Sequence, residues 1–191
     1  PLITRAIRRA IEANIFDEIW VNSESDIIGD IAKTQDVKFH KRPLKYASNS
    51  ATSEDFVYEF MVAHQSDYLF QVHSIAPLLD ANQIKGFVQS MIGSKCDVQL
   101  SVVDEQIECV MNNAPVNFSF DKKQNSQELS PVQRITWSIT GWKSSTYIDA
   151  YNQQKCATYS GSIGTYSISR EAGHIIKTES DLHMAELLLK L

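Results

Sequence analysis

Residues 67–87 read DYLFQVHSIAPLLDANQIKGF, and this stretch decides the fold. The apolar run 68–72 predicts a short strand, and the apolar residues that follow at helical spacing predict a helix. Between the two, the strand ends at His73 and Ser74. Ligands of α/β proteins bind at the carboxyl ends of strands, so His73 and Ser74 are candidate ligand contacts.

The segments around this unit repeat the same alternation. Short apolar runs predict strands at 18–22, 37–40 and 98–103, and amphipathic patterns predict helices between them. Strands that alternate with helices of about 10 to 15 residues favour an α/β fold. We therefore expect a mostly parallel sheet that is covered on both faces by helices.

Two predicted helices carry start signals. Residues 23–26 (SESD) and 178–181 (TESD) have the spacing of a capping box, in which the first side chain and the fourth cap each other's backbone N–H groups. The polar stretch 47–53 precedes another predicted helix, and it either caps that helix or contacts a ligand.

The pattern changes after residue 104. Strand-like segments at 107–110, 116–120 and 134–139 follow one another without long helices, and the polar run 121–127 predicts an exposed loop. We interpret this part as a strand-rich excursion from the main sheet. A helix at about 144–154, a strand at 162–169 and the last helix complete the expected order.

Composition limits the classes of function. The 191 residues suit one domain, and the net charge of −5 argues against nucleic-acid binding or attachment to an acidic membrane. No apolar run reaches the length that spans a bilayer, and no signal-peptide pattern is present. The three cysteines lack metal-ligand spacing, so we expect a reducing cytoplasm, with Cys96 buried as an apolar side chain.

At this point the sequence resembles a family, the cytidylyltransferases that make CMP-activated acidic sugars such as acylneuraminate. The resemblance covers almost the whole chain in five pieces that occur in the family's order. The pieces are PLITRAIRRAIEANIFDEIWVNSESDIIGDIA (1–32), HKRPLKYASNSATSEDFVYEF (40–60), DYLFQVHSIAPLLDANQI (67–84), PVNFSFDKKQNSQELSPVQRITW (115–137) and IIKTESDLHMAELL (175–188).

The resemblance implies a doubly wound sheet like that of nucleotide-diphospho-sugar transferases, in one domain of residues 1–191. It implies a nucleotidyltransferase that couples CMP from CTP to a sialic-acid-like nonulosonic sugar for surface polysaccharide synthesis, with release of pyrophosphate and use of Mg²⁺. Family members are mostly dimers, so it also implies a homodimer, with residues 115–152 as the dimerisation excursion. Trp137 and Trp142 fall there, and we expect them at the subunit interface.

The resemblance also suggests binding residues, while no residue is assigned to catalysis. Arg42 matches the family's arginine-proline pair and is the candidate cation for the nucleotide; its alternative role is a surface ion pair. His73 and Ser74 are candidates for the nucleotide, although a histidine at a strand end is often structural. Gln127 lies in a motif similar to the family's glutamine-acid-leucine element, and it either contacts the sugar or nucleotide or is an ordinary loop residue.

Three departures from the family pattern leave alternatives open. Family members begin with a strand and a phosphate-binding loop, and this chain begins after that point, so we expect it to lack both. Residues 175–177 (IIK) stand where many members have the Asp-x-Asp element that suits magnesium, so the metal ligands are unassigned. Residues 75–77 (IAP) stand where many have Thr-Ser-Pro. The alternatives are a catalytically inactive dimeric interaction module and an enzyme for another sugar acid, such as 3-deoxy-octulosonic acid.

Overall fold

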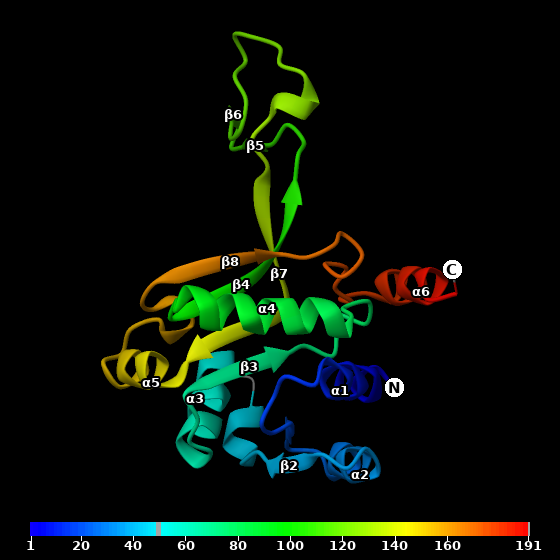
Figure 1. Ribbon diagram of the computed structural model, residues 1–191, viewed down its shortest axis with the longest axis vertical. Helices are drawn as coiled ribbons and strands as arrows, with labels where there is room; N and C mark the ends of the chain where they lie inside the picture. The colour runs from blue at the N-terminus through cyan, green and yellow to red at the C-terminus, as the bar shows by residue number, and fades with distance from the viewer. Residues whose placement is uncertain (49–50, 191) are drawn as a thin grey trace.

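The computed structural model describes residues 1–48 and 51–190 (Figure 1). Asn49 and Ser50 of the predicted capping or ligand-binding stretch lie outside the described residues. The elements, in chain order, are α1 (Leu2–Ala13), β1 (Trp20–Ser23), α2 (Asp26–Thr34), β2 (Lys38–Lys41), η1 (Leu44–Ala47), α3 (Ser53–Ala63), β3 (Tyr68–Val72), α4 (Ala81–Ser94), β4 (Val98–Glu105), β5 (Val110–Met111), β6 (Ala114–Pro115), η2 (Ser126–Glu128), β7 (Val132–Lys143), α5 (Ser144–Asn152), η3 (Ala157–Tyr159), β8 (Ile163–Ser167) and α6 (Glu179–Leu188).

The strands of the body form two groups. One contains β3, β7, β4 and β8 in that order, and the other is the parallel pair of β1 and β2. Strand β7 is antiparallel to β3 and to β4, whereas β4 and β8 are parallel, so β3, β4 and β8 share one direction. The expected mostly parallel α/β sheet is confirmed, with β7 as the reversed strand.

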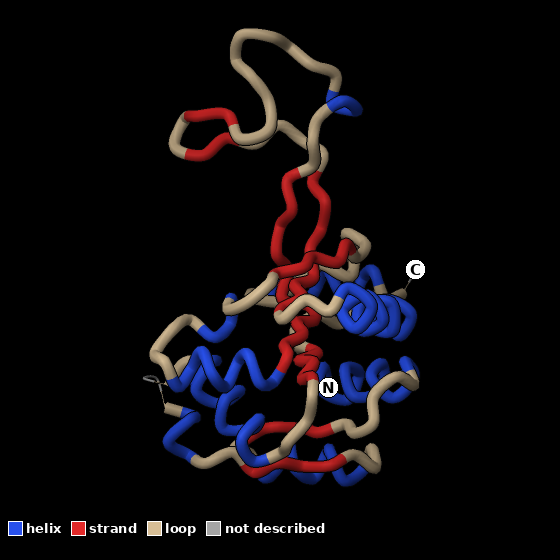
Figure 2. The backbone as a smooth tube through the Cα atoms, turned by 60° about the vertical axis from the view of Figure 1, so that its left-hand side comes forward, coloured by secondary structure: helices blue, strands red, loops and turns tan. Residues whose placement is uncertain are grey.

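Helices cover both faces of the sheet, which is why the strand sequences are apolar on both sides. On one face α1 and α4 pack together over a buried cluster that includes Ala13, Ile84 and Phe87. On the other face α3 and α5 pack together, and Val57 and Tyr147 belong to their cluster. Figures 1 and 2 show this layered body. It is the doubly wound arrangement expected from the sequence.

A bulge in β7 separates the body of the sheet from a projecting hairpin. Thr140 pairs with Leu100, but Ile135 already pairs with Val102, so β7 advances by five positions where β4 advances by two. Trp137, inside the bulge, has a left-handed φ of 56°, which is uncommon for a residue with a side chain. Beyond the bulge the two strands continue as a ribbon that carries residues 106–131, which we call the arm (Figures 1 and 2).

The structure refines the expected excursion of 115–152. Only residues up to 131 belong to the arm, because β7 returns to the sheet and α5 packs against α3. The predicted strand at 116–120 is wrong, since those residues form no strand, and the short β5 and β6 pair with each other instead. The dimerisation role of the arm stays a prediction.

One of the two predicted capping boxes is confirmed. Thr178 and Asp181 cap each other's backbone N–H groups at the start of α6. The box at 23–26 is wrong, because Ser23 still belongs to β1 and its hydroxyl accepts a hydrogen bond from the Ser25 N–H. Strand β1 therefore extends one residue into the expected cap, and α2 starts at Asp26 without a side-chain cap.

Two expectations about single side chains are decided by the packing. Cys96 is buried as expected. Trp142 is not at an exposed interface, because β7 continues to Lys143 between β3 and β4. Its side chain is only 3% exposed, packs on Tyr147, and donates a hydrogen bond from Nε1 to the Thr158 carbonyl at 3.1 Å.

Two isoleucines on α4 test the position of the core. Ile84 is fully buried, whereas Ile92 is 50% exposed on the same helix. We expect Ile84→Ala to lower the free energy of unfolding by about 2–5 kcal/mol through lost burial and a residual cavity. The control Ile92→Ala should change it by less than about 1 kcal/mol. Urea denaturation of both variants measures this, and equal losses would contradict the packing described here.

Candidate functional site

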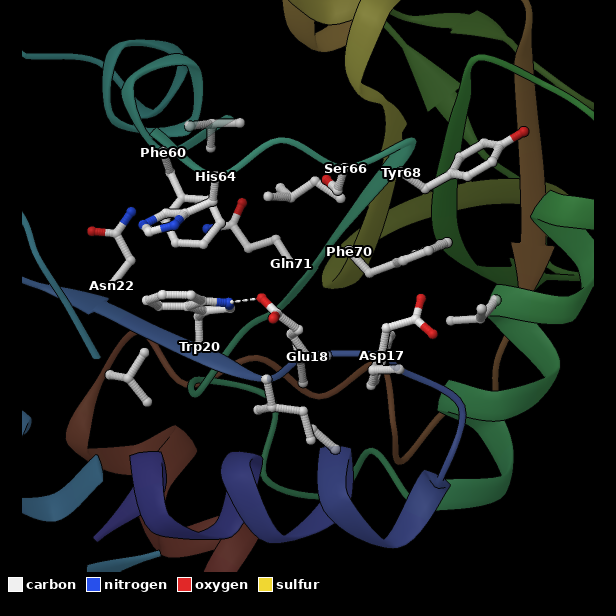
Figure 3. A pocket seen from close by; sticks show the side chains of 18 of the residues that line it. Asp17, Glu18, Trp20, Asn22, Phe60, His64, Ser66, Tyr68, Phe70 and Gln71 are labelled. Carbon is white, nitrogen blue, oxygen red and sulfur yellow. Dashed lines mark hydrogen bonds between the residues drawn. The ribbon is translucent and has the colours of Figure 1, made fainter. Parts of the chain in front are cut away.

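The carboxyl ends of β1, β2 and β3 bring polar side chains to one edge of the sheet. β1 and β2 are parallel, and Figure 3 shows β1 and β3 running in the same direction on either side of a cavity. Asn22 lies at the end of β1, Arg42 directly follows β2, and His73 directly follows β3. This is the edge at which α/β proteins bind ligands.

Unpaired polar atoms concentrate at this edge. Among the described residues, four buried side-chain polar atoms lack a hydrogen-bond partner, and three of them are Asn22 Oδ1, Arg42 Nε and His73 Nε2. The fourth is Thr140 Oγ1 inside the sheet. A buried polar atom without a partner costs on the order of 1–3 kcal/mol, so three of them at one edge indicate a site whose partners come from a ligand.

Arg42 is held in a fixed orientation. Its Nη2 forms an ion pair with Glu24 Oε2 at 2.8 Å, and its guanidinium lies over the Phe56 ring, 4.7 Å from the centroid. The backbone N–H of Arg42 donates to the Ser23 carbonyl at 3.1 Å. The ion pair expected under the alternative role is therefore present, but the side chain is only 16% exposed and its Nε remains unpaired. Arg42 is a positioned cation rather than a mobile surface side chain.

His73 is placed by β7. Its backbone N–H donates to the Ser138 carbonyl at 3.1 Å, and its ring meets Trp137 with centroids 6.4 Å apart. Burial lowers the pKa of His73 to about 4, so the imidazole is neutral near pH 7. A neutral imidazole offers one N–H donor and one acceptor, so His73 suits a hydrogen bond to a ligand and not a charge pair.

Ser74 and Gln127 lie in different parts of the molecule. Ser74 is in the turn after β3, which is closed by a hydrogen bond from the Ala76 N–H to the His73 carbonyl. Gln127 is exposed in η2 on the arm, where its carbonyl accepts a hydrogen bond from Gln106 Nε2 at 2.9 Å. The structure thus places His73 and Ser74 together at the strand edge, and Gln127 away from the body on the arm (Figure 1).

Sequence reasoning missed two features of this region. Asn22 was assigned only to a strand, although the rule that singled out His73, a polar residue at a strand end, applies to it equally. The second is a cluster of three side chains. His40 Nδ1 lies 2.9 Å from His64 Nε2, and His40 Nε2 lies 2.9 Å from Glu59 Oε2. No sequence spacing predicts this cluster, because β2 and α3 bring its residues together.

The described residues do not form a protein-held magnesium site. No group of three or more His, Cys, Asp or Glu side chains with suitable placement occurs among them. At 175–177, where the resemblance led us to expect the acidic element of many family members, Ile175 packs against the core, and the Lys177 N–H donates to Asp181 Oδ2 at 3.0 Å. The Asp181 carboxylate also accepts from Thr178 in the capping box. Nothing in this segment matches the oxygen-ligand set that magnesium prefers.

The fold and the polar strand edge define a doubly wound α/β domain with a candidate ligand site at the carboxyl ends of its strands. Comparison with known proteins gives the family: a family model described as cytidylyltransferase matches residues 1–141. The chain belongs to the cytidylyltransferase family. No helix of residues 1–48 and 51–190 has the length and apolar character needed to cross a bilayer.

Individual relatives agree with this family. N-acylneuraminate cytidylyltransferase A of Danio rerio is 29% identical over 104 residues, which cover 54% of this chain and 24% of the relative. The N-acylneuraminate cytidylyltransferase of Oncorhynchus mykiss is 29% identical over 86 residues, or 44% of this chain and 20% of the relative. The matched part of the chain thus spans about a quarter or less of these curated relatives.

Solved structures show the same fold at low identity. A CMP:2-keto-3-deoxy-manno-octonic acid synthetase complexed with CTP superposes with a TM-score of 0.72 at 14% identity, covering 100% of this chain and 88% of that one. The 4-diphosphocytidyl-2C-methyl-D-erythritol synthase from Anaerococcus prevotii DSM 20548 gives 0.70 at 13% identity, covering 100% and 89%. The nucleotide-diphospho-sugar transferase-like fold expected from the sequence is confirmed.

The lowered pKa of His73 predicts a pH dependence of stability. The unfolded chain binds a proton near pH 6.5 and the folded chain only near pH 4, so stability is full above about 6.5 and falls as the pH drops towards 4. Between pH 7 and 5 the loss should be about 2 kcal/mol. His73→Phe should remove this part of the loss, and the control His183→Phe, on an exposed residue of α6, should retain it.

Urea denaturation at the two pH values measures this difference. If the His73→Phe variant loses as much stability on acidification as the unaltered chain, the buried neutral state assigned to His73 is wrong.

Proposed function

We propose that the chain is the nucleotide-binding core of a CTP-dependent nucleotidyltransferase that transfers CMP to an acidic sugar and releases pyrophosphate. The observation that supports this proposal most directly is the group of unpaired polar atoms of Asn22, Arg42 and His73 at the strand edge. The chain that presents them belongs to the cytidylyltransferase family. The curated relatives named as N-acylneuraminate cytidylyltransferases support the acidic sugar as acceptor.

The reaction explains why this edge is polar without being acidic. A sugar hydroxyl oxygen forms a bond to the α-phosphorus of CTP, the bond from that phosphorus to the bridging β-phosphate oxygen breaks, and pyrophosphate leaves with the electron pair. The hydroxyl loses its proton, for which no described residue is assigned as the base. Negative charge grows on the leaving group, so fixed donors and cations at the nucleotide lower the barrier.

Each strand-end residue has a role that its surroundings allow. Arg42, oriented by Glu24 and Phe56, offers its unpaired Nε–H to an anionic or carbonyl oxygen of the nucleotide. Asn22 offers an amide oxygen, which accepts a hydrogen bond. His73 and Ser74 add a neutral imidazole and a hydroxyl directly after β3. Together these groups suit a nucleoside phosphate.

The sugar acid is proposed as sialic-acid-like. 3-Deoxy-octulosonic acid remains the second candidate, because the CTP complex of a synthetase named for that type of sugar has the same fold. Gln127 is proposed as a sugar contact. Since the arm carries it away from the body of its own chain, it suits the site of a second subunit.

A homodimer held by the arm accounts for the exposed apolar residues there. Five large apolar side chains of the arm are 52–68% exposed, and these are Ile107, Val110, Met111, Val116 and Phe120. A projecting segment with such side chains suits burial against a second copy. We propose the reducing cytoplasm as the location and Mg²⁺ as a companion of the CTP phosphates.

A second candidate function keeps the fold without the reaction. Residues 175–177 (IIK) stand where many family members are expected to carry acidic ligands, Ile175 packs against the core, and the nearby Asp181 carboxylate caps α6. This observation favours a non-catalytic dimeric interaction module. The two candidates differ in one respect that can be measured, since the module would not bind CTP.

Substitution of Arg42 tests its place at the nucleotide. We expect Arg42→Ala to raise the Kd for CTP about 10- to 100-fold, since one charge-assisted hydrogen bond contributes on the order of 1.5–3 kcal/mol. The Kd of the Arg42→Lys variant should lie between those of the unaltered chain and of Arg42→Ala, because lysine keeps the charge and loses the planar donor group. Arg134→Ala, which removes an exposed ion pair beside the arm, is the control and should bind as the unaltered chain does.

Isothermal titration calorimetry gives the three affinities, with circular dichroism to confirm folding. An unchanged CTP affinity for a folded Arg42→Ala variant would refute the assignment of Arg42. Absence of CTP binding by the unaltered chain would favour the interaction module.

Two valines test the arm as a dimer contact. Val116 on the arm and Val62 on α3 are 52% and 53% exposed, so the same substitution meets a similar local environment. We expect Val116→Asp to weaken self-association at least tenfold, because a carboxylate in an apolar interface must be desolvated, and Val62→Asp to leave it unchanged. Sedimentation equilibrium measures the association constant, and equal effects of the two variants would argue against the arm.

A further inference from the structure

One face of β2 carries a row of basic side chains, each beside an acid. Side chains two positions apart on a strand lie on the same face, and the ladder with β1 continues to the Arg42 N–H. The three pairs along this face are Lys38 with Glu18, His40 with Glu59, and Arg42 with Glu24. Of the three bases, only histidine changes its charge near neutral pH. The middle pair is therefore the one that a change of pH alters.

The acid beside His40 comes from α3, together with a second histidine. His40 Nε2 lies 2.9 Å from Glu59 Oε2, and His40 Nδ1 lies 2.9 Å from His64 Nε2. The side chains of His40 and Glu59 are only 12% and 18% exposed. The His64 ring also packs on the Trp20 ring, with centroids 4.0 Å apart (Figure 3). We call His40, Glu59 and His64 the histidine cluster, which ties β2 to α3.

The distance between the two imidazoles limits how many protons the histidine cluster holds. Two ring nitrogens 2.9 Å apart share a single hydrogen, which one ring donates and the other accepts. The Glu59 carboxylate accepts from the other nitrogen of His40. The cluster therefore accommodates two neutral rings, or one neutral and one protonated ring. With both rings protonated, two N–H groups and two positive charges would face each other, and the contact is lost.

The surroundings of His64 disfavour its protonation. Burial and the neighbouring His40 lower the pKa of the His64 imidazole, and Lys38 acts in the same direction. Glu59 and Glu18 oppose this shift without cancelling it. His64 therefore takes up a proton less readily in the folded chain than in the unfolded one. The contact between the rings stabilises the folded chain above the ordinary histidine pKa of about 6.5, and this stabilisation is lost as the pH falls below it.

The same helix also holds Arg42. The Arg42 guanidinium lies 4.7 Å from the centroid of the Phe56 ring. Phe56 precedes Glu59 on α3 by three residues, so the two side chains lie on one side of the helix. His40 and Arg42 are likewise neighbours on one face of the strand. Strand and helix are thus joined by two adjacent contacts, and loss of the first loosens the second.

We propose that the histidine cluster is a pH-sensitive contact that fixes Arg42 against α3. The contact is closed while the two rings hold at most one added proton, and it opens when a second solvent proton binds to a ring nitrogen. The opening itself involves no nucleotide. Its consequence, weaker binding of CTP at acidic pH, rests on the proposed function, in which Arg42 contacts the nucleotide.

Substitution of His64 by glutamine tests the opening. The amide of His64→Gln donates to or accepts from His40 Nδ1 without taking up a proton, so the contact stays closed at every pH. His183→Gln, on an exposed residue of α6, is the matched control. Nuclear Overhauser effects between the Arg42 side chain and the Phe56 ring are measured at pH 7 and pH 5 without CTP. The amide signals of α4 report whether the fold is intact.

At pH 5 we expect these Overhauser effects to weaken at least threefold in the unaltered chain and in His183→Gln, and to persist in His64→Gln. The α4 signals should show a folded chain in all three. Equal behaviour of the unaltered chain and His64→Gln would overturn the proposal, and so would weakening that accompanies the loss of the α4 signals.

Titration with CTP at the two pH values measures the consequence for the site. If nine-tenths of the chain is open at pH 5, the apparent Kd rises about tenfold. Protonation of CTP itself affects every variant alike, so the ratio of Kd at pH 5 to Kd at pH 7 should be about tenfold larger in the unaltered chain than in His64→Gln. Equal ratios would overturn the control of binding by the cluster. Opening in a chain that binds no CTP at either pH would support the pH-sensitive contact and refute the proposed function.

Discussion

The pairing of β7 with two neighbours at once is the constraint on which the structure depends. β7 lies between β3 and β4, so it joins the strand that ends at His73 to the strand that leads to the arm. Without the bulge around Trp137, one straight strand could not serve both the sheet and the projecting ribbon. The same strand therefore positions the candidate site, through the Ser138 carbonyl under His73, and the arm that carries Gln127.

The polar strand edge is a consequence of the parallel strands. Parallel strands place Asn22, Arg42 and His73 at a common edge, and their buried polar atoms remain unpaired there. The cavity between β1 and β3 reaches the same edge, because Asn22 belongs both to its lining and to the polar group.

Much of this organisation follows from local sequence rules. The apolar run before His73 predicted β3, and the threonine-aspartate spacing at 178–181 predicted the start of α6. Local rules failed where the pairing of strands distant in sequence determines the structure. Nothing in the run 134–139 marks a bulge, and Trp142 was misplaced because β7 continues through Gly141 into the sheet.

The candidate site was predictable only in part, for the same reason. His73 follows from its place at a strand end, but its neutral state depends on burial by segments distant in sequence. The ion pair between Arg42 and Glu24 likewise joins two loops that no spacing connects. The sequence predicted a strand-rich excursion in this region, and only the structure shows that the arm projects from the body and leaves large apolar side chains exposed.

The central claim is that a cytidine nucleotide binds at the carboxyl ends of β1, β2 and β3. The most direct measurement is a titration of isotope-labelled chain with CTP, followed through its backbone amide signals by NMR, which detects weak as well as tight binding. The account predicts saturable shifts that cluster at Asn22, Arg42, His73 and Ser74. Absence of shifts up to millimolar CTP, or shifts confined to the arm, would contradict it.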